Sequence, residues 1–600
     1  MTIIEKILSN HSNKDSLKPG DIPDVTIDVR GARDFGGANV IQHIEKNDLP
    51  IADPSKCFFT FDTNPTGSDQ KYAVNQHICR TFARKHGIKV YDIDNGIGTH
   101  TFIDEGLAYP GSTVVTTDSH ANILGAVGAF GQGMGDKDIA AAFSAGKVWF
   151  KVPKSVKLNF TGERPKGISA KDIVLNLLKR FGANSLLGYS VELYGDAIDK
   201  LSLDERITIA SMGTEMGVVT LMFPPNGEVI EYCSLRAGKD IEPIFADDDA
   251  EYEAEYDVDI SEFVNMVSRP GKPHDAVNWT EAHKVKIDSA FIGSCTNGRM
   301  EDLREAADVL KDRKVAPGVV LKIVPSTDKI WRQALDEGLV DIFKQAGALL
   351  SNAGCAGCAA GQVGQNGPGE ITISTGNRNF PGKQGKGSVY LASPANVAAS
   401  AVAGYITVYN NIPEKPAVFE QTGKVSTQRS AVDKAAEKDR PMTVKGRIWV
   451  IDEDNIDTDM IFHNRYLAIT DINEMGQYAF DNLEGYEDFS QKVKKGDIII
   501  AGKNFGSGSS RQQAVDCFKA LGVQAVIAKS FGSIYERNAI NAAFPILTYD
   551  DLSALKPEDK DEIELNFETG KIKNLSKGTE AKITPFYEVQ AEIYQKGGLF

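Results

Sequence analysis

Three cysteines have the spacing that is most informative about chemistry in this sequence. Cys355 and Cys358 form a C-x-x-C pair inside a loop rich in glycine and alanine, and Cys295 follows an apolar run in FIGSCTNGR. The chain has seven cysteines, an odd and sparse set that does not indicate a disulfide framework and favours a reducing compartment. The other four are interpreted as small buried hydrophobic side chains: Cys57, Cys79, Cys233 and Cys517.

The C-x-x-C pair alone is compatible with a redox dithiol, a zinc site or an iron–sulfur site. A redox dithiol would begin a helix in a small βαβ domain, whereas this pair lies in a glycine-rich loop. A closed zinc site needs four Cys or His ligands, and the local sequence offers no second C-x-x-C and no nearby His. Three thiolates leave a [4Fe–4S] cube one protein ligand short, and the open iron can then act as a Lewis acid on a substrate oxygen. Unrelated buried thiols remain an alternative on spacing alone.

The elements that must position these cysteines alternate between apolar, β-rich runs and segments of helical length. The β-rich runs lie at residues 57–63, 112–120, 286–295, 319–327 and 497–505. Strands separated by helix-length segments predict an α/β fold with largely parallel sheets. Cys295 then lies at a strand end, where such sheets place their ligands.

A chain of 600 residues is too long for one hydrophobic core. The clearest boundary is the polar, charged and proline-bracketed range 411–445, which predicts a linker. We expect three α/β domains before it and one after it: residues 1–155, 156–284, 285–410 with the cluster cysteines, and 446–600.

The bulk properties exclude several classes of partner. The formal net charge is 66 − 82 = −16, and such an acidic surface argues against nucleic acid as a partner. No apolar run is long enough to span a membrane, and the start lacks the apolar region and cleavage site of a secretory signal. We expect a cytoplasmic protein, because an exposed [4Fe–4S] cluster needs reducing conditions, with an organelle matrix as the alternative. The open iron of such a cluster implies a small-molecule substrate. The sequence indicates no particular oligomeric state.

Four motifs resemble those of the aconitase superfamily: SCTNGRMEDL (294–303), NAGCAGC (352–358), GNRNFPG (376–382) and GSGSSRQQA (506–514). Their order is similar to that of an isopropylmalate-isomerase-type large subunit joined through the linker to its small, swivelling subunit. The resemblance covers nearly the whole chain. It implies a [4Fe–4S]-dependent hydro-lyase with three aconitase-like α/β domains around the cluster, a C-terminal swivelling α/β domain, and an active site in the cleft before that domain.

The resemblance also implies roles for individual residues. Cys295, Cys355 and Cys358 would hold the cluster, and Asn297 would form a hydrogen bond near it. Ser509 would act as the base, with its pKa lowered by backbone N–H groups and Arg511. The other catalytic residues would be Asp62, His100, Asp118, His120, Glu215 and Asp459. The substrate-binding residues would be Ser119, Asn377, Arg378, Lys383, Arg465, Ala468, Ser510 and Arg511.

The sequence departs from the family pattern at several of these places. Thr63 stands where the family usually has the His that protonates the departing hydroxyl, so we expect His100 or His120 to take that role. Three further departures replace an Asn, a second Arg and a Gln: Ser211, Lys383 and Ala38. Together they indicate a substrate other than citrate.

The segment IFHNRYLAITD (461–471) is the most informative about the substrate. Ala468 and Ile469 stand where homoaconitase-like enzymes place an Arg, and apolar residues there resemble the isopropylmalate type. Arg465 and His463 lie a few residues earlier and could bind a distal carboxylate instead, which would favour the homoaconitase type. We expect an alkyl-substituted malate such as 3-isopropylmalate, with aconitate or homoaconitate hydration as the alternative.

Two other kinds of function remain as alternatives. One is an RNA-binding regulator, which the acidic charge disfavours. The other is a catalytically silent relative, a hypothesis that Thr63 motivates. The three cysteines, Ser509 and Arg511 favour an active enzyme instead.

Overall fold

The computed structural model describes residues 1–66, 69–358, 363–417, 440–509 and 511–599. The chain divides into two compact units, Met1–Glu420 and Gln421–Phe600. The division falls inside the range 411–445 that the sequence predicts as a linker.

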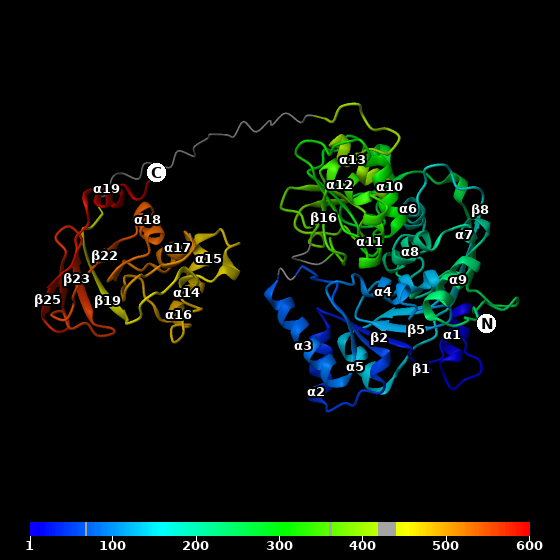
Figure 1. Cartoon of the computed structure of the whole chain (residues 1–600), viewed down its shortest axis with the longest axis horizontal. Helices are drawn as coiled ribbons and strands as arrows, with labels where there is room; N and C mark the ends of the chain where they lie inside the picture. Colours follow the sequence, from blue (N-terminus) through cyan, green and yellow to red (C-terminus); the bar gives the residue numbers. More distant parts are fainter. Residues whose placement is uncertain (67–68, 359–362, 418–439, 510, 600) are drawn as a thin grey trace. The chain divides into compact units, whose positions relative to one another are not determined.

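The first unit begins with a parallel sheet of strand order β4-β3-β2-β5-β6. Strands β2 and β5 of this sheet are labelled in Figure 1. Neighbouring residues of a strand point to opposite faces. Phe59 and Val115 accordingly pack with α2, α3 and α5, whereas Phe58 and Val114 pack with α4 on the other face. Strands β1 and β7 form a separate antiparallel pair. The bounds in this region are α1 (Ile3–Asn10), β1 (Asp24–Thr26), β2 (Val29–Arg33), α2 (Gly37–Lys46), β3 (Cys57–Thr60), α3 (Gln70–His86), β4 (Lys89–Tyr91), α4 (Gly98–Asp104), β5 (Thr113–Thr116), β6 (Phe130–Gly133), α5 (Asp136–Ala145) and β7 (Lys147–Trp149).

A second parallel sheet, of strand order β10-β9-β8-β11, shares a hydrophobic core with the α4 face of the first. The 3₁₀ segment Ala121–Val127 lies at this junction. Its Gly125 is so close to β10 that an added Cβ would lie 2.0 Å from the Leu221 carbonyl oxygen, so the position requires glycine. The bounds in this region are β8 (Ser155–Thr161), α6 (Ala170–Phe181), β9 (Ser190–Tyr194), α7 (Asp196–Asp199), α8 (Leu203–Ser211), β10 (Thr220–Met222), α9 (Gly227–Ala237) and β11 (Ala254–Asp259).

A third sheet has the strand order β13-β12-β18-β17-β14-β15-β16. Its strands from β18 to β16 are parallel, whereas β12 is antiparallel to both neighbours. Because β12 and β13 belong to this sheet, the third region begins before the expected boundary at residue 285. The bounds are β12 (Met266–Ser268), β13 (Ala276–Asn278), β14 (Ser289–Ile292), α10 (Met300–Leu310), β15 (Val320–Ile323), α11 (Asp328–Asp336), α12 (Leu339–Ala346), β16 (Leu349–Leu350), β17 (Ile371–Ser374), β18 (Ser388–Leu391) and α13 (Pro394–Ala403).

The second unit contains a mixed sheet of strand order β22-β21-β20-β19-β23-β24-β25. The long strand β19 pairs in parallel with β20 through its second half and antiparallel with β23 through its first half. The bounds are β19 (Thr443–Ile451), α14 (Thr458–Ile461), α15 (Ile472–Met475), α16 (Phe489–Lys492), β20 (Ile498–Ala501), α17 (Gln513–Leu521), β21 (Ala525–Ala528), α18 (Ser533–Asn541), β22 (Ile546–Thr548), β23 (Glu562–Asn566), β24 (Lys571–Asn574), β25 (Thr579–Lys582) and α19 (Glu588–Lys596).

The architecture confirms the α/β fold expected from the sequence, and each of the β-rich runs contains a strand: β3, β5, β14, β15 and β20. In the described ranges, no helix combines the length and apolar character needed to cross a bilayer.

Candidate active site

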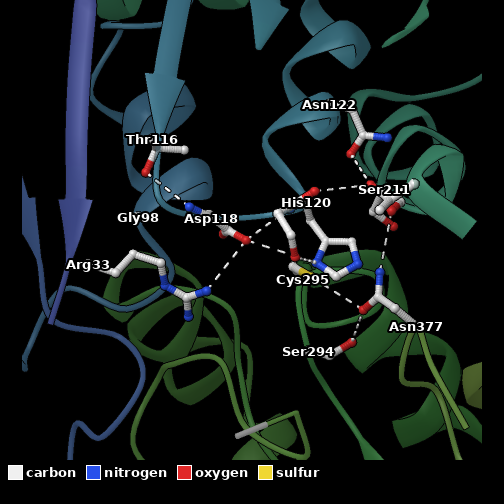
Figure 2. Close-up of polar contacts among 12 residues, drawn as sticks. Arg33, Gly98, Thr116, Asp118, His120, Asn122, Ser211, Ser294, Cys295 and Asn377 are labelled. Carbon is white, nitrogen blue, oxygen red and sulfur yellow. Dashed lines mark hydrogen bonds and ion pairs between the residues drawn. The ribbon is translucent and has the colours of Figure 1, made fainter. Parts of the chain in front are cut away.

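Cys295 lies just beyond the carboxyl end of β14, at the edge where parallel sheets place ligands. The preceding Ser294 has φ +73°, a left-handed conformation that non-glycine residues adopt rarely and that clusters at functional sites. The Cys295 thiol and the Ser294 hydroxyl both donate to the side-chain oxygen of Asn377, each at 3.3 Å (Figure 2). Cys295 is 1% exposed. The strained turn therefore holds a buried thiol against the segment that follows β17.

Cys355 and Cys358 lie in the loop after β16. Between them, Gly357 has φ +70°, and an added Cβ would lie 2.9 Å from the ring of Phe291, so this turn requires glycine. The two thiols are hydrogen-bonded to each other. This bond, together with burial, raises the pKa of Cys355, and the same bond lowers the pKa of Cys358.

Each of the three thiols also has a cationic partner, namely His120 for Cys295, Arg33 for Cys355 and Lys383 for Cys358. Cationic neighbours stabilise the thiolate, which is the form of cysteine that binds metal. The family departure at Lys383 thus places an ammonium group beside Cys358.

An ion-pair network joins the ends of strands in the first sheet. Arg33 Nε donates to Asp62 Oδ1 at 2.6 Å. Arg33 Nη1 lies 3.4 Å from Asp118 Oδ1 (Figure 2). Asp62 also accepts from the backbone N–H of Gly98 at 2.9 Å. Burial raises the pKa of Asp62 to about 6, and Arg33 limits the rise. The network therefore fixes two predicted catalytic carboxylates around one guanidinium.

A second chain of contacts begins at His120. Its Nε2 lies 3.0 Å from Glu215 Oε1, and Arg378 Nε donates to both Glu215 oxygens at 2.9 and 3.1 Å. Burial would lower the pKa of His120, but Cys295 and Glu215 raise it well above its ordinary value. Burial would raise the pKa of Glu215, but His120 and Arg378 hold it below its ordinary value. The predicted site residues His120 and Arg378 thus both contact the Glu215 carboxylate.

His100 contacts the cysteine turn through its backbone. Its Nε2 lies 3.0 Å from the Cys295 carbonyl oxygen, and because a carbonyl can only accept, Nε2 carries the proton. Burial, with Arg299 adding to it, lowers the pKa of His100 to about 4. Ser119 is exposed, with its hydroxyl 3.5 Å from His120 Nδ1.

The other departures from the family have ordinary local partners. The Thr63 N–H donates to Asp34 at 3.1 Å, and the Ser211 hydroxyl donates to the Thr208 carbonyl at 2.8 Å. Ala38 is half-buried on α2.

The donor set fits an iron–sulfur cluster. Several residues of this site have a buried polar atom without a hydrogen-bond partner among the described residues: Arg33 Nη2, His100 Nδ1, Asp118 Oδ2 and Asn297 Oδ1. Buried polar groups are nearly always paired, so these atoms indicate a place that another polar group completes. In the described ranges, no set of three or more His, Cys, Asp or Glu side chains is arranged to bind a single ion. The three thiols can supply one thiolate to each of three corners of a [4Fe–4S] cube.

The predicted residues of the second unit form their own arrangement. Arg511 is 6% exposed, and its Nη1 and Nη2 contact the two Asp459 oxygens at 2.6 and 2.7 Å. The Thr458 hydroxyl donates to the Ser509 carbonyl at 3.2 Å, and Ser509 itself is exposed. The loop that carries Ser509 and Arg511 is therefore bound to α14. Ser510 lies outside the described residues.

The segment expected to determine specificity also lies in the second unit. Arg465 Nη2 donates to Asp481 at 2.7 Å, and its guanidinium lies over the Tyr466 ring. Leu467 and Ala468 are exposed. Arg465, the cation nearest in sequence to Ala468, is thus paired with Asp481 of the same unit, and Leu467 and Ala468 remain exposed.

Two buried basic residues that contact residues of this site, Arg33 and Lys171, were not predicted from the sequence. Arg33 lies at the end of β2, on the edge that carries Asp62 and Asp118, and its position in VRGARDF was the available signal. Lys171 lies in the stretch ISAKDIVLNLL, directly after the first residue of α6, and shares one helical face with Val174 and Leu178. A charged residue inside an apolar stripe was the available signal there.

The comparisons with known proteins identify the family of this chain. The model of the aconitase family (aconitate hydratase) matches residues 5–284 and 278–404, and that of the aconitase C-terminal domain matches residues 418–551. The chain belongs to the aconitase family and is an enzyme of the hydro-lyase class.

Individual relatives cover most of the chain. The 3-isopropylmalate dehydratase large subunit 1 of Methanopyrus kandleri is 38% identical over 68% of this chain and 98% of its own. The mitochondrial homoaconitase of Debaryomyces hansenii is 33% identical over 82% of this chain and 76% of its own. A solved 3-isopropylmalate dehydratase of Methanocaldococcus jannaschii is 38% identical over 26% of this chain and 90% of that one, with a TM-score of 0.25.

Proposed function

We propose that this hydro-lyase is a [4Fe–4S]-dependent dehydratase or isomerase of a small 2-hydroxy acid, with Cys295, Cys355 and Cys358 as cluster ligands. The observation that carries the proposal is the gathering of three thiols, each with a cationic partner, beside unpaired buried polar atoms. When bound, the cluster would supply a Lewis acid for the hydroxyl and carboxylate of the substrate.

Arg378 is proposed to bind a substrate carboxylate. Glu215 takes the Nε–H of Arg378, which leaves the Nη groups as a planar pair of donors. The salt bridge to Glu215 also fixes the guanidinium before substrate arrives.

His120 is proposed to donate the proton to the departing hydroxyl. In the family this role belongs to the His that Thr63 replaces in this chain. Its Nε2 faces the Glu215 carboxylate and its Nδ1 lies 3.5 Å from the Ser119 hydroxyl, so both nitrogens face side chains that can exchange protons. In His100, by contrast, Nε2 is bonded to a backbone carbonyl. His120→Asn should therefore lose more turnover than His100→Asn.

Ser509 of the second unit is proposed to remove the proton next to the second carboxylate. A serine hydroxyl is a weak base, so nearby positive charge must favour its alkoxide. Arg511 supplies that charge two residues away, oriented by Asp459.

The proposed substrate is an alkyl-substituted malate such as 3-isopropylmalate. Ala468 and Leu467 offer an apolar surface, and Arg465 is already paired with Asp481. A substrate with an additional carboxylate there would leave a charge without a partner, which is costly when water is excluded. Relatives named 3-isopropylmalate dehydratase support this choice, whereas relatives named homoaconitase support the alternative, aconitate or homoaconitate hydration.

The test is a substrate panel with anaerobically reconstituted full-length enzyme, followed through the ultraviolet absorbance of the alkene. The panel contains 3-isopropylmalate, dimethylmalate, citramalate, homocitrate and citrate. We expect kcat/KM for isopropylmalate to exceed that for homocitrate by on the order of 100-fold. A preference for homocitrate or citrate would contradict the alkyl specificity, and no turnover of any compound would contradict the enzyme proposal.

A further inference from the structure

Lys171 is a fully buried lysine on the first turn of α6. Its Nζ donates to the backbone carbonyl oxygens of Thr375 and Gly376, both at 2.9 Å. A third contact, to the Met212 sulfur, is 3.7 Å long. Burial lowers the pKa of Lys171 to about 7. The two hydrogen bonds offset part of the cost of removing the amino group from water. An apolar side chain would fill this place more cheaply, so the lysine calls for a reason beyond packing.

The two carbonyl groups belong to the turn that carries two proposed site residues. Directly after Gly376, Asn377 accepts from the Cys295 thiol at 3.3 Å. The next residue, Arg378, is bonded to Glu215. A displacement of this turn would therefore move both the contact to a cluster cysteine and the carboxylate-binding guanidinium.

The other polar groups of the turn are bonded within the third sheet. The Thr375 N–H donates to the Phe291 carbonyl, and the Thr375 hydroxyl donates to the Gly293 carbonyl, each at 3.0 Å. These bonds fix the start of the turn on β14. Lys171 instead belongs to α6, in the region of the second sheet. It donates to the carbonyl groups of Thr375 and Gly376 and so joins that region to the turn.

The residue next to Lys171 provides a useful comparison. Asp172 Oδ1 accepts from the N–H of Met266 on β12, at 3.0 Å. Both residues thus join the first turn of α6 to the third sheet, but Asp172 reaches a strand without site residues. Lys171 instead contacts the turn before Asn377, and Asn377 contacts Cys295.

We propose that Lys171 is a positioning residue, which holds the Thr375–Gly376 turn so that Asn377 contacts Cys295 and Arg378 is aligned for substrate. Its consequence for turnover rests on the proposed function, whereas its consequence for the Cys295 thiol does not.

The experiment uses the full chain without its cluster. Lys171→Met is exposed to iodoacetamide, and the alkylation rate of each cysteine is followed by mass spectrometry. Loss of the two hydrogen bonds should increase the rate at Cys295 about tenfold. The rates at Cys233 and Cys517, which are buried elsewhere, should stay within about twofold of those in the unsubstituted protein, since a local displacement leaves distant packing unchanged.

Arg206→Met is the matched control. Arg206 is also a fully buried cation, and it donates to the carbonyls of Leu201, Pro224 and Ile198 near α8. Its loss should destabilise the protein without a selective change at Cys295. Equal increases at all cysteines in Lys171→Met, or no increase at Cys295, would overturn the proposal.

A milder variant, Lys171→Gln, keeps one side-chain donor and should give an intermediate rate at Cys295. If Lys171→Met and Lys171→Gln both failed to fold while Arg206→Met folded, Lys171 would be a residue of global stability and the proposal would be wrong. In reconstituted enzyme, Lys171→Gln should raise KM more than it lowers kcat, because Arg378 loses its alignment. If unsubstituted enzyme has no activity, the proposed function fails, and the alkylation result still decides the role of Lys171.

Discussion

The backbone N–H of Cys355 donates to the carbonyl oxygen of Asp62 at 2.9 Å. This bond joins the cysteine loop after β16 to the end of β3, which belongs to a different sheet. The Asp62 side chain then continues the connection to Arg33. Backbone and side chain of one residue thus fix a proposed cluster ligand against the buried ion-pair network.

The first prediction concerns Arg33, whose guanidinium lies between two buried carboxylates. Arg33→Gln should lower the free energy of unfolding by about 3–5 kcal/mol, because it leaves Asp62 and Asp118 without their cation. Denaturant unfolding of the first unit measures this. Arg80→Gln, which breaks a partly exposed pair with Asp92, is the control and should cost about 0–1 kcal/mol. Equal losses in both variants would contradict the prediction.

The second prediction concerns Arg299, which follows Cys295 in the same loop and is 4% exposed. Its Nη1 and Nε donate to Asp104 and Asp204, each at 2.8 Å, and so join α4, α8 and the cysteine loop. Arg299→Lys keeps the charge but cannot bridge both carboxylates, so it should cost about 1–3 kcal/mol of stability.

The measurement for Arg299 is the thermal unfolding midpoint. Arg304→Lys serves as its control, since Arg304 pairs with Glu337 at the surface. A midpoint for Arg299→Lys that is no lower than that of the control would show that the buried bridge contributes nothing.

The third prediction is a pH dependence of stability. His11 Nε2 lies 2.8 Å from Asp28 Oδ2. Burial opposes both charges, but Asp28 and the Ile7 carbonyl raise the pKa of His11 above its ordinary value of 6.5, and His11 lowers that of Asp28 below 3.8. The His11 contribution is complete below pH 6.5 and is lost as pH rises through the raised value. The Asp28 contribution is complete above pH 3.8 and is lost as pH falls through the lowered value.

The pair should therefore stabilise the fold most between pH 3.8 and 6.5. His11→Gln should lower stability by about 1 kcal/mol at pH near 5 and by clearly less at pH near 8.5. Thermal unfolding across this range measures the difference, with His77→Gln on the exposed side of α3 as control. An effect of His11→Gln that is the same at all pH values would disprove the linkage.

The fourth prediction concerns specificity. Ala468→Arg adds a cation to the exposed apolar segment of the second unit. It should lower kcat/KM for isopropylmalate on the order of 100-fold and improve that for homocitrate, because the added charge matches a carboxylate and not an alkyl group. Steady-state kinetics with both substrates tests this, and Thr470→Arg is the control for added charge nearby. If both variants shift specificity alike, Ala468 does not contact the substrate.

The sequence predicted the elements that depend on local patterns. The run SAFIGSC specified strand β14 and the cysteine at its end, and the polar range 411–445 contained the division between the units. It did not predict the antiparallel half of the second unit, because the short strands β23 to β25 follow one another without helices between them.

Long-range partners were the least predictable features. Arg33 and Lys171 acquire their roles from residues 29 to 205 positions away, at Asp62 and Gly376, and no local pattern records such contacts. The pairing of Arg465 with Asp481 depended equally on tertiary structure. The motifs identified the thiols and two of their cationic partners, His120 and Lys383, whereas Arg33 was found only from the fold.

The measurement that tests the central claim most directly is the iron and sulfide content of anaerobically reconstituted protein. The unsubstituted chain should bind about four iron and four sulfide per chain, with the broad visible absorbance of a cluster. Cys295→Ser, Cys355→Ser and Cys358→Ser should each lose most of both, while Cys233→Ser should retain them. Full iron and sulfide in any of the three ligand variants, or none in the unsubstituted protein, would contradict the account.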